Sequence, residues 1–525
     1  RMTYVFDLGD PATNADPFPA FAHLRQHDPV HWSPAMKAWI VTRYADVRQV
    51  ALNNREISAD RLTPFFRATP EYRSGAIKSL VRYLNHWMVF RDPPDHTRLR
   101  RLFTKAFTPT AVANLAPNIE SIVGDLIDGM EAKARRGEPV DFIADFAYPL
   151  PASVIMDLLG VPRTDLARVK VWSDEIALFI GTAQVAGNKY LRAEQGSRAM
   201  AAYFRDLVEA RTREPAADMI SQLVLARDDR DALSTDEIIG TCILLLFAGH
   251  ETTTNLIGNG FLYSMRNRDQ WERLVAAPAL AESAIEEWLR YDGPSGALAR
   301  VAAADLELGG KTIREGQRVF AFVNSANRDP EAIEDPERFD IGRPQNMHMT
   351  FGHGIHFCLG APLARLEGAI AARRLAQHPD LEALERPAQH IGPGECDDQR
   401  QHGAEMDAAA LDQDRHAIRH SHRHHGRRVA HGERDAVAVG QIEGGRFLDF
   451  GADRAHPHIQ ARHLEDALQL GHVAQVERVA GVVFRNQQQV ARLGTDFFDR
   501  SHGGLHRQGQ HLFGQVVPAT GKKVG

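Results

Sequence analysis

The residues with the most distinctive chemistry lie in a short loop with three glycines and one cysteine. The loop spans residues 351–360 and reads FGHGIHFCLG, and a helix is predicted directly after it, over residues 359–377. Gly352 and Gly354 allow backbone conformations that other residues avoid. Amide groups at the start of the helix can then point at the sulfur of Cys358 and favour thiolate over thiol.

Two interpretations of this cysteine compete. A lone buried cysteine is usually just a small hydrophobic residue. An iron thiolate instead needs an anionic sulfur, hydrogen bonds that tune it, and clearance for a macrocycle. The loop offers all three features, because Gly360 removes a side chain where a flat ligand would lie close to the backbone. The pattern therefore favours a thiolate ligand to iron.

An acid and an alcohol stand side by side in a long helix that is predicted over residues 234–264. They are Glu251 and Thr252, and two small residues, Ala248 and Gly249, precede them. Small residues would let the helix bulge and leave room for dioxygen. An acid and a neighbouring alcohol can then hand protons to an oxygen whose O–O bond is breaking. The alternative is that the hydroxyl group of Thr252 only bonds back to a helix carbonyl.

Two further pairs have helical spacing. Glu287 and Arg290 are three residues apart, so they share one helical face and can form an ion pair. His96 and Arg100 are four apart, and together they suit an anionic carboxylate. For either pair, taken alone, the alternative is a solvated surface charge.

Together these motifs resemble those of the bacterial cytochrome P450 family. Residues 351–360 match its haem-binding signature F-G-x-G-x-H-x-C-x-G at every fixed position, and residues 248–253 resemble its oxygen-activating motif A-G-x-E-T-T. The resemblance covers residues 4–385, approximately. It implies a mainly α fold with a minor β part, in which haem b lies between the long distal helix and the helix after the cysteine loop. It also implies a monooxygenase that inserts one oxygen atom of O2 into an apolar small molecule.

The resemblance assigns roles to individual residues. Cys358 would bind the iron, Thr252 would stabilise the oxygen as it is reduced, and Glu251 would deliver protons. The residues expected to contact the cofactor are His96, Arg100, Ala248, Arg300, Phe351, His356, Cys358 and Gly360. Glu287 and Arg290, with Arg338 of a P-E-R-F segment, would hold the cysteine loop in place. The candidate substrate pocket consists of apolar residues that could also be ordinary core: Leu80, Val81, Phe179, Leu244, Leu245, Ala297 and Leu298.

Electrons are expected to come from NAD(P)H through separate proteins, a ferredoxin or flavodoxin and its reductase. The chain has no cysteine set for an iron–sulfur cluster and no G-x-G-x-x-G that opens a β-α-β unit. A possible basic patch for an acidic donor consists of Arg98, Arg101, Lys105, Arg373 and Arg374. The alternative interpretation of that patch is solvated charge.

Two other functions stay open: a peroxide-driven relative, and a non-catalytic or inactive haem or ligand binder from a disrupted gene.

Composition indicates a cytoplasmic protein. The net charge of -6 gives no sign of a nucleic-acid partner, and three cysteines cannot build a disulfide framework. No apolar run reaches the roughly 18 residues of a membrane span, and the first residues do not resemble a signal peptide.

The character of the chain changes near Glu385. All 6 tryptophans and all 9 tyrosines precede this point, whereas 15 of the 25 histidines follow it. We therefore predict a P450 domain over residues 1–385 and an atypical His/Arg/Gly-rich tail over residues 386–525. Out-of-frame translation of GC-rich DNA explains that composition best; an appended domain and a metal-binding tract are the alternatives. The strand and hairpin with which family members continue are not recognised in the tail.

Overall fold

The computed structural model describes residues 5–378, apart from residues 69, 107, 181–187, 226, 229 and 230. The predicted tail over residues 386–525 lies outside the described residues. Helices make up most of the described chain, as predicted. The α-helices are α1 (Pro11–Ala15), α2 (Phe18–His27), α3 (Tyr44–Leu52), α4 (Leu62–Ala68), α5 (Pro70–Arg73), α6 (Lys78–Leu84), α7 (Asp95–Ala106), α8 (Pro109–Ala113), α9 (Ala116–Arg135), α10 (Pro149–Leu159), α11 (Leu166–Ile180), α12 (Lys189–Arg213), α13 (Met219–Leu225), α14 (Thr235–Arg266), α15 (Arg268–Ala276), α16 (Ala281–Asp292), α17 (Val323–Ala326) and α18 (Ala361–Ala376).

The strands are short and form one main sheet and two hairpins. They are β1 (Val30–Ser33), β2 (Ala38–Val41), β3 (Ile57–Ser58), β4 (Arg227–Asp228), β5 (Asp231–Ala232), β6 (Ala297–Ala302), β7 (Leu306–Leu308), β8 (Lys311–Ile313) and β9 (Arg318–Phe322). The main sheet has the order β1-β2-β9-β6-β3, in which only β2 and β9 run parallel. The minor β part of the prediction is thus confirmed.

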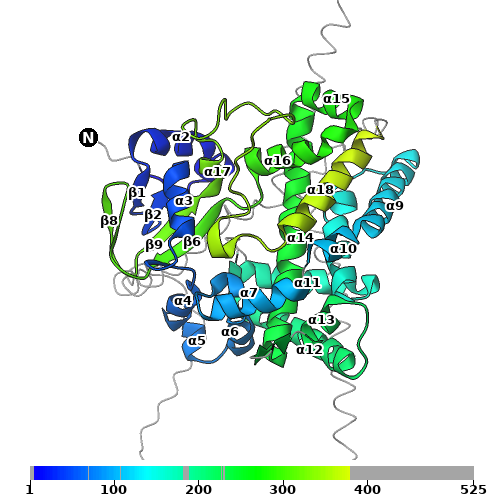
Figure 1. Cartoon of the computed structure of the whole chain (residues 1–525), viewed down its shortest axis with the longest axis horizontal. Helices are drawn as coiled ribbons and strands as arrows, with labels where there is room; N and C mark the ends of the chain where they lie inside the picture. Colours follow the sequence, from blue (N-terminus) through cyan, green and yellow to red (C-terminus); the bar gives the residue numbers. More distant parts are fainter. Residues whose placement is uncertain are drawn as a thin grey trace, which may run out of the picture. The chain divides into compact units, whose positions relative to one another are not determined.

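Alternating side chains explain how this sheet is buried on both faces. Ile40 and Phe320 belong to a core cluster that also contains Phe21 of α2. Their neighbours Val41 and Val319 belong to a different cluster, which also contains residues of α3. This is the period of two that a strand imposes on its side chains. In Figure 1 the sheet lies among α2, α3 and α17, apart from the long helices.

The longest helix, α14, is the axis of the helical part. It begins with a capping box, in which Ser234 and Glu237 each accept a hydrogen bond from the other's backbone amide. It packs against α10, α12, α16 and α18, and Figure 1 shows α18 running beside it. Gly260 permits the close approach of α16, because a Cβ atom there would lie 2.0 Å from the ring of Trp288. The helix is therefore buried on most sides.

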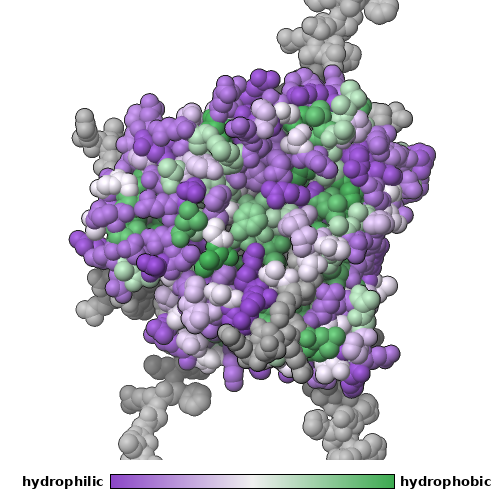
Figure 2. Space-filling model, in the orientation of Figure 1, coloured by the Kyte–Doolittle hydropathy of each residue, from purple (hydrophilic) through white to green (hydrophobic). Residues whose placement is uncertain are grey.

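The face of the molecule in Figure 2 is mostly polar. Figure 2 shows a largely hydrophilic face with several small hydrophobic areas. In the described part of the chain, no helix combines the length and the apolar character that crossing a membrane requires.

Candidate functional site

The cysteine loop has the backbone geometry that its glycines predicted. Gly352 and Gly354 both have a φ of +71°, in the left-handed region. The loop closes on itself through a hydrogen bond of 2.9 Å from the Cys358 amide to the carbonyl oxygen of Phe351. Gly360 then caps α18, so Cys358 precedes this helix by only three residues.

Cys358 is half-buried, and two opposing effects act on the pKa of its thiol. Burial raises the pKa of the Cys358 thiol. The backbone amides of Gly360 and Ala361 donate to the sulfur, and the guanidinium of Arg100 attracts its negative charge, so all three lower the pKa against the effect of burial. A Cβ atom on Gly360 would lie 3.9 Å from the sulfur. The donor is thus prepared to bind a metal cation as a thiolate, because a coordinated cation deprotonates a thiol.

A cluster of cations and imidazoles lies around this loop. The rings of His96 and His356 are 4.2 Å apart. Burial, followed by the charges of Arg300, His96 and Arg100, lowers the pKa of His356 to about 3. Burial also lowers the pKa of Arg300 to about 10, with Asp92 acting in the opposite direction. The structure thus brings together His96, Arg100, Arg300 and His356, which the sequence predicted as haem contacts.

This cluster fits the two propionates of a haem. His96 is only 2% exposed, and neither of its ring nitrogens has a hydrogen-bond partner among the described residues. Asp92 is the acid that acts on His96 and Arg300, but its carboxylate already accepts hydrogen bonds from the hydroxyl group of Ser58 and the amide of Ala59. Buried positive charge of this kind needs an anion. The described residues therefore suit the group that the resemblance implies.

Sequence reasoning missed one member of the cluster. Burial, together with the nearby charge of Arg300, lowers the pKa of Arg61 to about 10. Arg61 lies 5.0 Å over the ring of Phe90, which stacks on Trp87, and Trp87 in turn contacts Phe247 of α14 at 5.6 Å between ring centroids. No helical spacing links Arg61 to the known motifs, so only the folded chain reveals it.

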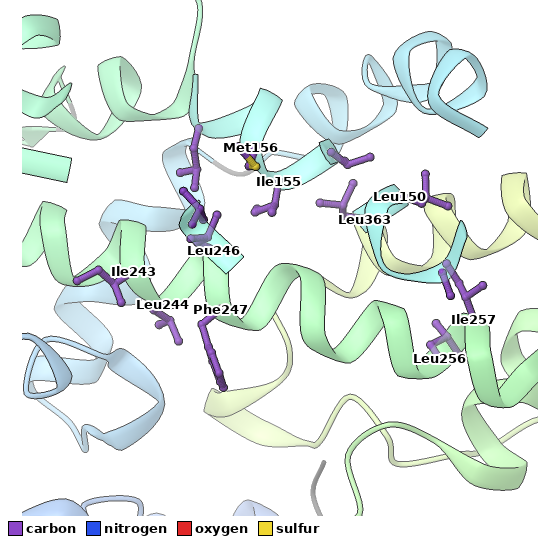
Figure 3. Close-up of a cluster of buried hydrophobic side chains, with 14 of the residues drawn as sticks. Leu150, Ile155, Met156, Ile243, Leu244, Leu246, Phe247, Leu256, Ile257 and Leu363 are labelled. Carbon is purple, nitrogen blue, oxygen red and sulfur yellow. The ribbon is translucent and has the colours of Figure 1, made fainter. Parts of the chain in front are cut away.

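One face of α14 has a different environment from the rest of the helix. Figure 3 shows Leu244 and Phe247 leaving α14 on the side opposite Ile155 and Leu363. Ala248 follows Leu244 by four residues and so shares its face, yet it is exposed in the middle of a mostly buried helix. This exposed alanine fits the predicted contact with a flat cofactor.

Gly249 has a packing role that the sequence did not predict. A Cβ atom on Gly249 would lie 2.8 Å from Cγ1 of Ile155 in α10. The glycine thus permits the contact between α10 and α14. The helix is regular α-helix through residues 248–252, without the bulge that was expected from the small residues.

Glu251 and Thr252 lie about one helical turn beyond Ala248 in α14. Burial, reinforced by the charge of Asp174 and opposed by that of Lys170, raises the pKa of Glu251 to about 7. The hydroxyl group of Thr252 donates to the carbonyl oxygen of Ala248 over 2.8 Å. The back-bond that was weighed as an alternative is therefore present, and it leaves the lone pairs of the Thr252 oxygen free to accept.

The Glu287–Arg290 pair is completely buried, with both side chains 0% exposed and two bonds of 2.7 Å between them. Arg290 also donates to the carbonyl oxygens of Asn327, Pro336 and Arg338. The prediction that this pair holds the chain leading to the cysteine loop agrees with these contacts.

The predicted role of Arg338 in this network is wrong. Its side chain is 62% exposed and lies 3.8 Å from Asp340. Arg343 contacts Glu287 instead, with Nε 3.2 Å from Oε2. The sequence signal was ambiguous because two arginines lie five residues apart, and only the turn over residues 334–343 decides which one points inward. Arg338 contributes its backbone carbonyl oxygen, which accepts from Arg290 and Arg343.

Two further residues that the sequence did not single out fix the loop. The side chain of Asn327 accepts from the Met349 amide at 2.7 Å and donates to the hydroxyl group of Thr350 at 2.9 Å. Thr350 in turn donates to the carbonyl oxygen of Leu289 at 2.7 Å. These bonds connect α16 and α17 to the residue before Phe351, whose ring lies beneath the Arg365 guanidinium.

The predicted pocket residues fall into different environments. Leu80, Val81, Phe179 and Leu244 are buried in the largest core cluster, against which Leu245 also packs. Ala297 belongs to the cluster beneath the sheet with Phe322, and Leu298 packs on the opposite sheet face. These positions stay predictions for the pocket.

Most of the predicted basic patch is paired with acids. Arg98 lies 2.5 Å from Glu237, and Arg373 lies 2.5 Å from Glu120, which Arg374 also approaches at 3.8 Å. Arg101 is exposed. The side chain of Lys105 lies outside the described residues. The paired arginines offer less attraction to a partner than their number suggests.

Comparisons with known proteins agree with this geometry. A family model described as Cytochrome P450 matches residues 37–388. The chain is 40% identical over 372 residues to the vitamin D(3) 25-hydroxylase of Pseudonocardia autotrophica, a match that covers 70% of this chain and 87% of that protein.

Two solved structures are also similar. P450BioI in complex with hexadec-9Z-enoic acid ligated acyl carrier protein is 36% identical, with a TM-score of 0.64 over 70% of this chain and 91% of that one. CYP109E1 from Bacillus megaterium in complex with testosterone is 35% identical, with a TM-score of 0.60 over 72% of this chain and 95% of that one. The chain therefore belongs to the cytochrome P450 family, and it is a haem b monooxygenase.

Proposed function

We propose that Cys358 is the iron ligand of this monooxygenase and that His96, Arg100, Arg300 and His356 hold the haem propionates. The observation that carries this proposal is the buried cluster of cations and imidazoles beside a sulfur that already accepts two backbone hydrogen bonds. To this set we add Arg61, which lies in the same cluster. When bound, the haem iron supplies the activation of dioxygen, and thiolate donation favours cleavage of the O–O bond.

We assign the delivery of protons during the reaction to residues of α14. Ala248 gives a flat surface without polar atoms in its side chain, and Thr252 presents a hydroxyl oxygen one turn further along. Glu251 holds a proton near neutral pH, because burial raises its pKa to about 7. An acid with a pKa close to the working pH can both release and regain a proton rapidly. Glu251 is thus the proton donor of the site, and the hydroxyl group of Thr252, the next residue, would stabilise the oxygen as it is reduced.

The substrate is an apolar small molecule. The relatives act on or bind vitamin D(3), testosterone and a carrier-bound fatty acid, according to their names. The predicted pocket positions on this chain are aliphatic or aromatic, without a charged anchor. We infer that the pocket recognises a large hydrophobic molecule by shape and that electrons arrive from NAD(P)H through a separate ferredoxin or flavodoxin and its reductase, as is usual for bacterial members of the family.

A binding screen followed by turnover tests the proposed function. The full chain, loaded with haem, is titrated with vitamin D(3), testosterone and hexadecenoic acid, and displacement of iron-bound water is followed in the Soret region. The compound with the strongest response is then incubated with NADPH, a ferredoxin and its reductase. The proposal predicts a product heavier by one oxygen atom, with label from ¹⁸O2. Unlabelled product, or peroxide-driven product alone, would contradict it.

A further inference from the structure

The guanidinium of Arg365 lies over the ring of Phe351, at the start of the cysteine loop. Its central carbon is 4.6 Å from the ring centroid. The carbonyl oxygen of Phe351 accepts the hydrogen bond of the Cys358 amide at 2.9 Å, so this ring belongs to the same closed loop as the sulfur. Burial raises the pKa of the Cys358 thiol, and the charges of Arg100 and Arg365 act against burial. Contact and charge thus both place Arg365 near the sulfur.

An ion pair with two hydrogen bonds fixes this guanidinium. Nε of Arg365 donates to Oε1 of Glu286 at 2.6 Å, and Nη2 donates to Oε2 at 3.0 Å. Such a bidentate pair fixes the orientation of the guanidinium as well as its position. The pair also joins α18, which contains Arg365, to α16, which contains Glu286. Arg365 is therefore held in place although its side chain is 40% exposed.

His348 supports the carboxylate from the chain that leads into the loop. Its side chain is 3% exposed, and its Nε2 atom lies 3.0 Å from Oε2 of Glu286. Its Nδ1 atom accepts from the Thr350 amide at 3.3 Å, which leaves the hydrogen on Nε2, facing the carboxylate. Burial alone would raise the pKa of Glu286, but His348 and Arg365 outweigh burial and lower this pKa to about 2. Glu286 is therefore a carboxylate at any pH near neutrality.

We propose that Arg365, held by Glu286, sets how readily iron bound to Cys358 is reduced. The inference rests on the proposed function of Cys358 as the iron ligand. Reduction adds one electron, which the separate donor protein supplies, and no bond of Arg365 or Glu286 forms or breaks. A positive charge near the sulfur stabilises the added negative charge, whereas a carboxylate opposes it. The two residues act through Cys358 and are positioning residues, not catalytic ones.

Substitutions in the pair should have opposite effects on the reduction potential. Arg365→Met removes the positive charge and leaves the carboxylate, so reduction should become about 10-fold less favourable, which is ~59 mV for a one-electron couple. Glu286→Gln keeps an oxygen that can accept from Arg365 but removes the negative charge, so the potential should rise. Arg365→Lys keeps the positive charge and should restore most of the parent potential. A loss of packing alone would not give shifts of opposite sign.

Spectroelectrochemical titration of the haem-loaded full chain measures the potential without substrate or turnover. The C–O stretching frequency of the reduced carbon monoxide complex is a second measurement, because a sulfur that donates more strongly lowers it. We expect a lower frequency in Arg365→Met and a higher one in Glu286→Gln. Arg373→Met is the matched control, since Arg373 lies on the same helix, is 38% exposed and pairs with Glu120 at 2.5 Å. This control should change neither property.

The outcomes separate this inference from the assignment of Cys358. A parent protein with the thiolate band, together with potentials that do not shift or that shift with the same sign, would overturn the role of the Glu286–Arg365 pair and leave Cys358 as the ligand. An equal shift in Arg373→Met would also overturn that role, because the effect would then not depend on position. If Arg365→Met loses the thiolate band, an unshifted potential in Glu286→Gln still decides against the pair. A parent without the thiolate band would overturn both proposals.

Discussion

Nε of Arg343 lies 3.2 Å from Oε2 of Glu287, within a group of buried ionic contacts that also includes Arg290. Glu287 accepts two further hydrogen bonds, from the Asp340 amide and from the side chain of Asn346. The guanidinium of Arg343 also donates to the backbone carbonyl oxygens of Glu334, Asp335 and Arg338. The carboxylate on α16 thus organises the turn over residues 334–346, which precedes the cysteine loop.

Replacement of Arg343 by alanine should destabilise the fold. It removes a charged hydrogen-bond donor from a buried carboxylate, which costs about 1.5–3 kcal/mol in the free energy of unfolding. Arg338→Ala is the matched control, because its exposed guanidinium contributes at most ~1 kcal/mol. Urea denaturation of both variants checks this. A larger loss for Arg338→Ala than for Arg343→Ala would restore the assignment made from the sequence.

Two glycines in helices should respond in opposite ways to alanine. Gly249→Ala places a Cβ atom 2.8 Å from Ile155 and should cost about 1–3 kcal/mol in the free energy of unfolding through overpacking. Gly129→Ala, in α9, meets nothing within 4 Å and should stabilise the protein by ~0.5–1 kcal/mol. Thermal unfolding of the two variants measures the difference. Equal shifts would show that Gly249 does not control the contact between α10 and α14.

The cation cluster should determine how tightly haem is held. Arg300→Leu removes a buried charge from the proposed propionate site, so haem should dissociate about 10- to 100-fold more readily, as expected for a lost charged hydrogen bond. Transfer of haem to apomyoglobin measures this rate. Arg314→Leu, in an exposed pair with Asp305, should leave the rate unchanged. An unchanged rate in Arg300→Leu would remove Arg300 from the cofactor site.

Turnover should depend on the protonation of Glu251. Because burial raises its pKa to about 7, the acid form is lost as the pH rises through 7, and kcat should decline there. Glu251→Gln should lower kcat about 100-fold, the lower range for a lost general acid, and it should flatten the alkaline decline. Both are measured with the hydrophobic compound identified in the binding screen. An alkaline decline that persists in Glu251→Gln would assign it to another group.

The motifs could be predicted from the sequence because each depends on local spacing. The Cys358 loop, the Glu287–Arg290 pair and the His96–Arg100 pair each lie within one turn or one helical face. Contacts that depend on the tertiary fold could not be predicted in this way. Arg61 reaches the cluster from between β3 and α4, and Asn327 bonds to Met349 and Thr350 across more than twenty residues.

The sequence also did not show which of two similar residues makes a given contact, or which neighbour a small residue accommodates. Two arginines, Arg338 and Arg343, could reach Glu287, and only the backbone turn between them decides. Gly249 was expected to leave room for dioxygen, but its missing side chain accommodates Ile155 of α10 instead. In both cases the residue type was informative, whereas the direction of the side chain depended on the fold.

The most direct test of Cys358 as the iron ligand is the carbon monoxide difference spectrum of the reduced, haem-loaded full chain, recorded beside Cys358→Ser. We predict the red-shifted Soret band of a thiolate-ligated haem in the parent protein and its loss in the variant. A parent spectrum with only the band of an imidazole- or thiol-ligated haem would contradict the assignment of Cys358.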